Sequence, residues 1–161
     1  KWRALMRQGW YPAAYFSRLP EPAGDDLRDD DPRAREWLRQ AIELGRDAPA
    51  ARQMAGREVR IAGFALPLAQ RGEDLTRFLL TPYQGACVHT PPPPANQAIV
   101  VSAAPPLPAA LAPYRLWVHG RLELQPQRTP YMHAAWHMQA LGFSRFDEAS
   151  EREYLPRYNS F

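Results

Sequence analysis

The sequence predicts a mainly β fold: a small antiparallel OB-like barrel preceded by one helix and an aromatic-rich N-terminal arm. Proline accounts for 18 of the 161 residues, about twice its ordinary usage, which disfavours an all-helical bundle. After Gly56 the hydrophobic period changes from helical spacing to alternation. Gly63 and Gly120 fall in the middle of alternating segments, where bulges or sharp coiling would help a small barrel to close.

The first 31 residues are predicted to form an arm and linker, followed by a single barrel domain over residues 32–161 that begins with a helix. The arm is aromatic and then acidic. It cannot form a core of its own, so we expect its rings to lie on the main domain. The helix is predicted over residues 32–44, because Asp31 can cap it, Pro32 suits its first turn and Gly45 suits its exit.

Five strands are predicted between residues 57 and 146. Four of them lie in REVRIAGFALPL (57–68), LTRFLLTPY (75–83), QAIVVSA (97–103) and RLWVHGRLEL (115–124). The fifth segment, TPYMHAAWHMQALG (129–142), is ambiguous. Thr129, Pro130 and Gly142 are typical of helix starts and stops. As a strand, the same segment would place Ala134, Trp136, Met138 and Ala140 on one face.

Composition and charge exclude several functional classes. The net charge is +3, but basic and acidic residues are interleaved, so a dedicated nucleic-acid surface is not expected. No apolar run reaches the roughly 18 residues of a membrane span. Cys87 is the only cysteine, which excludes an intrachain disulfide and a CxxC motif. The sequence contains no Walker, GxSxG, HExxH or dinucleotide motif.

A long stretch without charged residues runs from Phe78 to Tyr114. It contains the proline run Pro91 to Pro94, which favours a stiff polyproline II conformation. Two interpretations are open: a loop that wraps the barrel, or a preformed docking surface for another protein. In both cases Pro91 to Pro94 and Pro105 to Pro108 should lie outside the strand ladders.

Part of this stretch, FLLTPYQGACVHTPPPPANQ (78–97), resembles the hallmark of a bacterial family of unknown function. The matching residues are Phe78, Leu79, Leu80, Pro82, Tyr83, Gly85, Ala86, Cys87, His89, Pro91 to Pro94, Asn96 and Gln97. The similarity extends from about residue 56 to about residue 146. The family's terminal aromatic–x–Met–x–Ala strand matches Trp136, Met138 and Ala140, and therefore favours a strand for residues 130–141.

The resemblance also carries a functional context. Members of the family resemble exported proteins, often encoded beside MacB-like ABC transporters within zinc-starvation gene clusters. This implies a periplasmic location, metal handling and a component of an ABC transporter as partner. We accordingly expect a signal or lipoprotein segment to have preceded Lys1.

Cys87 and His89 are the candidate metal ligands, because thiolate and imidazole suit Zn²⁺ or Cu⁺. In a flat strand they would lie roughly 6.6 Å apart, so the chain must turn there, as Gly85 and the prolines allow. The alternative is a buried cysteine beside a hydrogen-bonded histidine. On a strand, His133 and His137 would be about 13 Å apart, so only one of them, His137, could join this site.

The sequence thus predicts a periplasmic accessory protein of a zinc-linked ABC transport system that binds Zn²⁺ and docks a partner through its proline-rich loop. It is predicted not to be an enzyme. The first alternative is an OB-type ligand-binding module that binds an oligomer through its aromatic rings and has a purely structural cysteine. A basic groove with exposed rings would favour that alternative. A Cys–His nucleophile is less favoured, because the uncharged stretch supplies no local acid, although Asn96 could orient the histidine.

Overall fold

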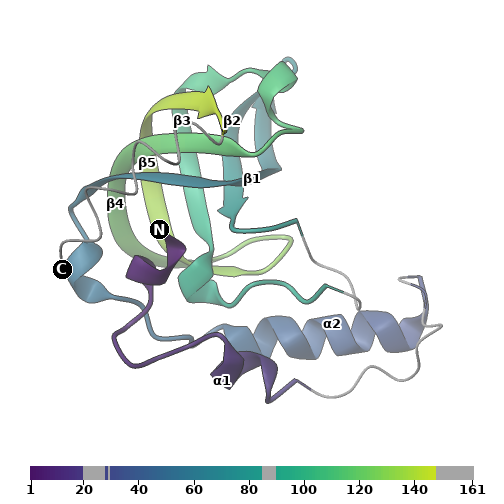
Figure 1. Ribbon diagram of the computed structural model, residues 1–161. Helices are drawn as coiled ribbons and strands as arrows, with labels where there is room; N and C mark the ends of the chain where they lie inside the picture. The colour runs from purple at the N-terminus through teal and green to yellow at the C-terminus, as the bar shows by residue number, and fades with distance from the viewer. Residues whose placement is uncertain (20–27, 29, 85–89, 148–161) are drawn as a thin grey trace.

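A closed five-stranded barrel forms the centre of the protein, as Figure 1 shows. The computed structural model describes residues 1–19, 28, 30–84 and 90–147. The strands follow one another as β1 (Glu58–Arg71), β2 (Asp74–Thr81), β3 (Ile99–Leu107), β4 (Leu116–Arg128) and β5 (His133–Arg145). Around the barrel their order is β1-β2-β3-β5-β4, with β4 closing on β1. The predicted mainly β, OB-like fold class is confirmed.

One pair of neighbouring strands departs from the predicted antiparallel arrangement. β3 and β5 run parallel, with Ile99 opposite Trp136, whereas the other four pairs are antiparallel. Successive strands of this barrel alternate in direction. Two strands separated by one strand in the sequence therefore point the same way, and they pair in parallel when the barrel places them side by side.

The predicted leading helix is present as α2 (Pro32–Gly45). The Asp31 carboxylate accepts a hydrogen bond from the backbone N–H of Arg33 at 2.7 Å, and Pro32 occupies the first turn. Gly45 does not provide a left-handed exit. It is the last helical residue, and a Cβ there would lie 3.1 Å from the Cα of Pro94, so the glycine permits a close approach. Among the described residues, no helix is both long and apolar enough to cross a membrane.

The N-terminal arm packs on the barrel. It contains a short helix, α1 (Ala13–Phe16), that the sequence did not predict. Leu5 is only 1% exposed and belongs to the main core, and Met6 forms an isolated β-bridge with Ala50. The Trp2 Nε1–H donates a hydrogen bond to the carbonyl of Ala62 in β1 at 2.6 Å.

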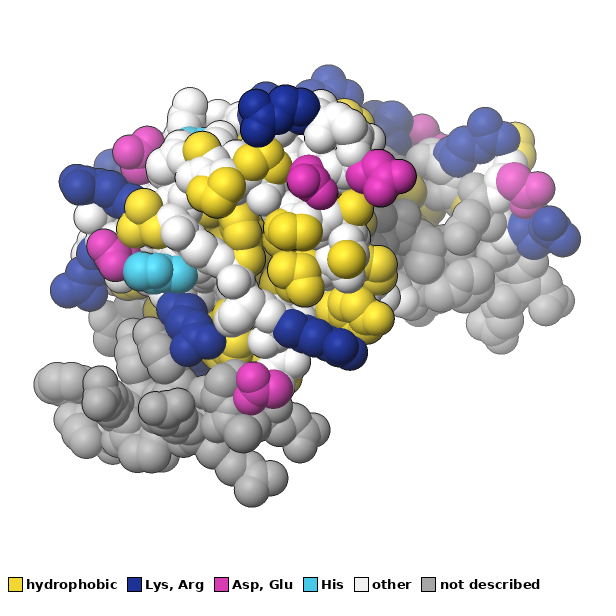
Figure 2. All heavy atoms as spheres, turned by 90° about the horizontal axis from the view of Figure 1, so that it is seen from above, with side chains coloured by type: hydrophobic (Ala, Val, Ile, Leu, Met, Phe, Trp, Pro, Cys, Tyr) yellow, Lys and Arg dark blue, Asp and Glu magenta, His cyan; other side chains and the backbone are white. Residues whose placement is uncertain are grey.

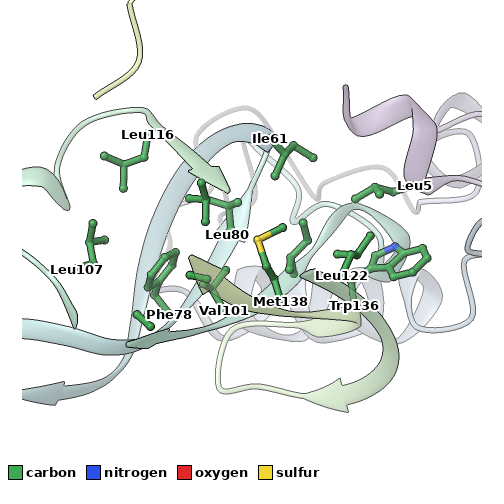
Figure 3. Packing of buried hydrophobic residues seen from close by; sticks show 14 of the residues in the cluster. Leu5, Ile61, Phe78, Leu80, Val101, Leu107, Leu116, Leu122, Trp136 and Met138 are labelled. Carbon is green, nitrogen blue, oxygen red and sulfur yellow. The ribbon is translucent and has the colours of Figure 1, made fainter. Parts of the chain in front are cut away.

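The main core fills the barrel with side chains from all five strands (Figure 3). Full burial of side chains of this size stabilises a fold by about 1.5–3 kcal/mol each. The labelled members are Leu5, Ile61, Phe78, Leu80, Val101, Leu107, Leu116, Leu122, Trp136 and Met138. A second cluster lies on the outside of the barrel, where Ile42 of α2 packs near Leu79 and Val100.

The two mid-strand glycines coincide with the coiling that was predicted for them. At Gly63, β1 changes partner from β4 to β2. At Gly120 the register of β4 against β5 shifts, and a Cβ would collide with the carbonyl oxygen of Gln139. Both positions therefore need glycine because a neighbouring strand approaches too closely for a side chain.

Residues 133–145 form β5, so the strand assignment is confirmed over the local helix signals. Thr129 is a turn residue rather than a helix cap. Its Oγ1 accepts from the backbone N–H groups of Tyr131 and Met132 and closes the β4–β5 hairpin. Serine and threonine favour both helix caps and turns, which is why the local signal was misleading.

The prediction that the prolines lie outside the strand ladders is confirmed, although one strand runs through two of them. Pro91 to Pro94 lie outside the strands, but β3 continues through Pro105 and Pro106 to Leu107. Neither Pro105 nor Pro106 has a register partner. The pairing with β2 moves from Ser102 directly to Leu107, so the two prolines occupy an irregularity that needs no backbone N–H.

Candidate functional site

The signature segment, residues 78–97, carries the family hallmark. It begins in β2 and ends shortly before β3. The Tyr83 hydroxyl donates a hydrogen bond to the carbonyl of Pro91 at 3.0 Å, which joins two residues on either side of positions 84–90. Burial raises the pKa of Tyr83 to about 12, so the phenol keeps its proton at neutral pH. Cys87 and His89, the first two predicted metal ligands, lie outside the described residues.

The proline run is packed inside the protein rather than displayed on its surface. Pro92, Pro93 and Pro94 are buried, and Pro91 is half-buried. The buried Tyr15 hydroxyl lies 3.1 Å from the carbonyl oxygens of both Pro92 and Ala41, so α1 links the run to α2. The prediction of a docking surface formed by this run is therefore wrong for Pro92 to Pro94, because their side chains face other parts of the same chain.

The last two signature residues also have structural partners. Asn96 is buried, and its Nδ2 donates to the carbonyl of Pro49 at 3.0 Å. The Gln97 Nε2 donates to the carbonyl of Trp2 at 3.1 Å. These amides bind the N-terminal arm and the segment after α2 to the start of β3. Much of the signature thus holds together segments that are distant in the sequence.

His137, the third predicted ligand, points away from the barrel core on β5. Its Nε2 lies 2.9 Å from the Ser102 Oγ of β3. Its Nδ1 lies 3.8 Å from the Glu123 carboxylate of β4 and makes no hydrogen bond within the described residues. The side chain is 18% exposed. Ser102 and Glu123 were not predicted as neighbours of His137, because only the register of three strands brings them together.

Ser102, His137 and Glu123 are arranged in the order of a serine–histidine–acid triad, but the hydrogen bond between the histidine and the acid is missing. The 3.8 Å separation is too long for a hydrogen bond. Ser102 pairs with Arg77 on one side and with Gln139 on the other, so the ladders occupy the backbone around it.

The remaining histidines have acidic partners. His133 Nε2 lies 3.3 Å from the Glu43 carboxylate of α2, and His119 Nε2 lies 2.6 Å from Glu58. The His133 hydrogen bond is the main reason that the pKa of Glu43 is lowered. His119 remains exposed although it is paired. Within the described part of the chain, no group of three or more His, Cys, Asp or Glu residues could hold a metal ion.

Comparison with known proteins gives a family. The fold is similar to the crystal structure of a DUF3299 family protein from Pseudomonas aeruginosa PAO1, with a TM-score of 0.66 and 26% sequence identity, over 91% of this chain and 93% of that chain. No curated protein matches. The model of the DUF3299 family, described as a protein of unknown function, matches residues 2–145 and so includes the N-terminal arm. The resemblance to a family of unknown function is confirmed, and the chain belongs to the DUF3299 family.

Proposed function

We propose that this protein acts by binding rather than by catalysis, as a periplasmic accessory protein of a zinc-linked ABC transport system. In this proposal Cys87 and His89 bind Zn²⁺. The observation that carries it is the Cys-x-His motif, which is flanked in the sequence by Tyr83 and Pro91, two residues joined by a hydrogen bond. A contact between the residues on either side of the motif supports the proposal that its two ligands bind one ion.

The ligand chemistry suits zinc. Thiolate and imidazole are both common zinc ligands, and two protein ligands leave coordination positions open for a third ligand or a partner. His137 is the proposed third ligand. The nearby Glu123 carboxylate is the kind of group that orients a metal-binding imidazole. To use its Nε2, His137 would have to give up its contact with Ser102.

Zinc titration by calorimetry tests this proposal on the wild type and on three variants. The Cys87→Ala, His89→Ala double variant should lose binding, and His137→Ala should weaken it by about tenfold, because one ligand is removed. His119→Ala is the matched control, since His119 is a strand histidine that also contacts a carboxylate, and it should bind zinc as the wild type does. Equal zinc uptake by the wild type and the double variant would refute the zinc site.

A second experiment addresses location and partner. A tagged full-length protein expressed with its export signal should fractionate with the periplasm and co-purify with an ABC transporter component. Pro92 and Pro93 are unsuitable interface probes because they are buried, so the variants should change exposed residues. Exposed rings suited to this are those of Tyr11 and Tyr114. Recovery of the protein only from the cytoplasm would refute the accessory role.

The alternative, an OB-type module that binds an oligomer through aromatic rings, has weaker support. A surface hollow beside β1, β4 and β5 contains Arg60, Trp117 and Phe143. The Trp117 side chain is buried there, and the Arg60 guanidinium lies 4.7 Å from the centre of its ring. Phe143 is half-buried and its ring centre lies 6.0 Å from that of Phe78, so neither ring of this hollow is fully exposed for stacking on an oligomer.

A further inference from the structure

A cavity of about 850 Å³ lies between the segment that follows α2, the β4–β5 hairpin and the N-terminal arm. This volume falls within the range of about 300–1,000 Å³ that is usual for small-molecule sites. Its basic lining residues are Arg7, Arg46, Arg52, Arg128 and the half-buried His133, and its other lining residues include Leu124, Pro126, Gln127 and Ala135. These residues come from segments that are far apart in the sequence.

The charge of this basic cavity is strongly unbalanced. Asp47 is the single acidic residue of its lining. Arg46 is neutralised by Glu43 and Asp47, at 3.2 and 3.3 Å. Arg7, Arg52 and Arg128 make no salt bridge with any described residue. These three guanidinium groups are therefore not engaged by an ion pair with a described residue, although Arg128 helps to lower the pKa of the nearby Glu43.

At another end of the molecule the surface charge is mixed rather than predominantly basic (Figure 2). Seen from above, hydrophobic side chains gather at its centre, with basic and acidic groups mixed around them (Figure 2). The predominance of one sign of charge in the basic cavity is thus a local property. It does not follow from a net charge of only +3.

The walls of the basic cavity are held in place by hydrogen bonds. The carbonyl of Pro49 accepts from the Arg7 backbone N–H and from the Asn96 Nδ2, each at 3.0 Å. The Ala51 N–H donates to the carbonyl of Leu5 at 2.9 Å. Because these walls are already ordered, the protein loses less conformational entropy when a ligand binds.

Gln127 adds a neutral donor. Its Oε1 accepts a hydrogen bond from the Arg77 guanidinium at 3.3 Å, which leaves the Nε2 as a donor. That Nε2 is buried and has no partner among the residues described. A buried donor without a partner is unfavourable unless a ligand or water accepts from it.

We propose that the basic cavity binds a small organic anion that carries two or more carboxylate or phosphate groups. Arginine forms paired hydrogen bonds with both groups. Gln127 can donate to one further oxygen, and Leu124, Pro126 and Ala135 contact the carbon skeleton of the ligand. None of the proposed zinc ligands is among the lining residues of this cavity, and the proposal does not depend on zinc binding.

Calorimetric titration of metal-stripped protein with citrate and with fructose 1,6-bisphosphate tests the proposal and separates organic carboxylates from organic phosphates. The wild type should bind at least one of them with a Kd below about 1 mM, and the affinity should fall as salt is added. The Arg52→Gln, Arg128→Gln double variant should bind about tenfold more weakly, because two charge-assisted contacts are lost. Gln127→Leu should weaken binding about threefold without any change in charge.

The matched control is the Arg18→Gln, Arg71→Gln double variant, which loses the same charge at exposed positions outside the cavity lining. It should bind within about twofold of the wild type. The Cys87→Ala, His89→Ala variant should also bind the anion normally, which separates this site from the zinc proposal. The inference is overturned if the wild type binds neither probe, or if both arginine variants weaken binding equally.

Discussion

Replacement of Gly120 by alanine should destabilise the barrel by an amount that can be worked out from the structure. A Cβ at this position would collide with the carbonyl oxygen of Gln139 and would lie 3.0 Å from the Cα of Ala140. It would also lie 2.8 Å from the Cγ of Met138. The Met138 side chain can rotate away, but the two backbone atoms belong to β5 and can move only if the β4–β5 ladder shifts.

The size of the effect follows from that rigidity. Overpacking a core usually costs 1–3 kcal/mol, and a clash with backbone belongs at the upper end, so we expect about 3 kcal/mol. A domain of this length loses roughly 2–4 °C of melting temperature per kcal/mol, so Gly120→Ala should melt about 6–12 °C lower than the wild type. This is a large fraction of a typical total stability of about 5–15 kcal/mol.

Gly142 is a matched control, because it lies in β5 opposite His119 and a Cβ there would meet no atom within 4 Å. Gly142→Ala should leave the free energy of unfolding unchanged or raise it by about 0.4–1 kcal/mol, because alanine lowers the conformational entropy of the unfolded chain. Urea denaturation followed by circular dichroism measures both variants. If Gly120→Ala is as stable as Gly142→Ala, the close approach of β4 and β5 at Gly120 is refuted.

Four further predictions concern the segments around the candidate site. Tyr15→Phe should lower the free energy of unfolding by about 1–2 kcal/mol, because the carbonyl groups of Ala41 and Pro92 lose their hydroxyl donor; an unchanged urea midpoint would contradict this. Tyr83→Phe should weaken zinc binding about threefold by removing the hydrogen bond between two residues that flank the Cys-x-His motif, with no change in the circular dichroism spectrum. Zinc affinity measured from pH 8 to pH 5 should fall steadily through the histidine range, since protons compete for the ligands. Because contact with His133 holds the pKa of Glu43 below its ordinary 4.5, Glu43→Gln should be less stable than the wild type above pH 4.5, and the difference should shrink as the pH falls through the lowered pKa.

The barrel and its leading helix could be predicted because their signals are local. The alternation in residues 115–124 specifies which side chains enter the core, and Asp31 with Pro32 specifies where α2 begins. The parallel pairing of β3 with β5 could not be read in this way. It depends on which strands become neighbours around the barrel, and no local pattern encodes that.

The candidate site was less predictable than the fold. The residue types at Cys87, His89 and His137 indicate metal chemistry, but the contacts of His137 with Ser102 and Glu123 depend on the register of β3, β4 and β5. A shift of one residue in any of these strands would turn one of the three side chains to the other face. The arginines of the basic cavity come from still more distant segments, and within their own neighbourhoods they look like ordinary surface charges.

The burial of the proline run has a physical explanation. Proline has no backbone N–H, so a buried run of prolines leaves only carbonyl groups that need partners. Those partners are available here. Pro91 accepts from Tyr83, Pro92 from Tyr15, and Pro94 from the backbone N–H of Gln97 at 2.8 Å.

The absence of charge around the run therefore fits an internal role as well as it fits a docking surface. What distinguishes the two is the aromatic arm. Tyr15 of α1 supplies the hydroxyl for Pro92, and Gly45 lets α2 approach Pro94. The arm and the proline run thus form one packing unit. An interface with a transporter component should accordingly be sought on the exposed charged and aromatic surface, and not on the run itself.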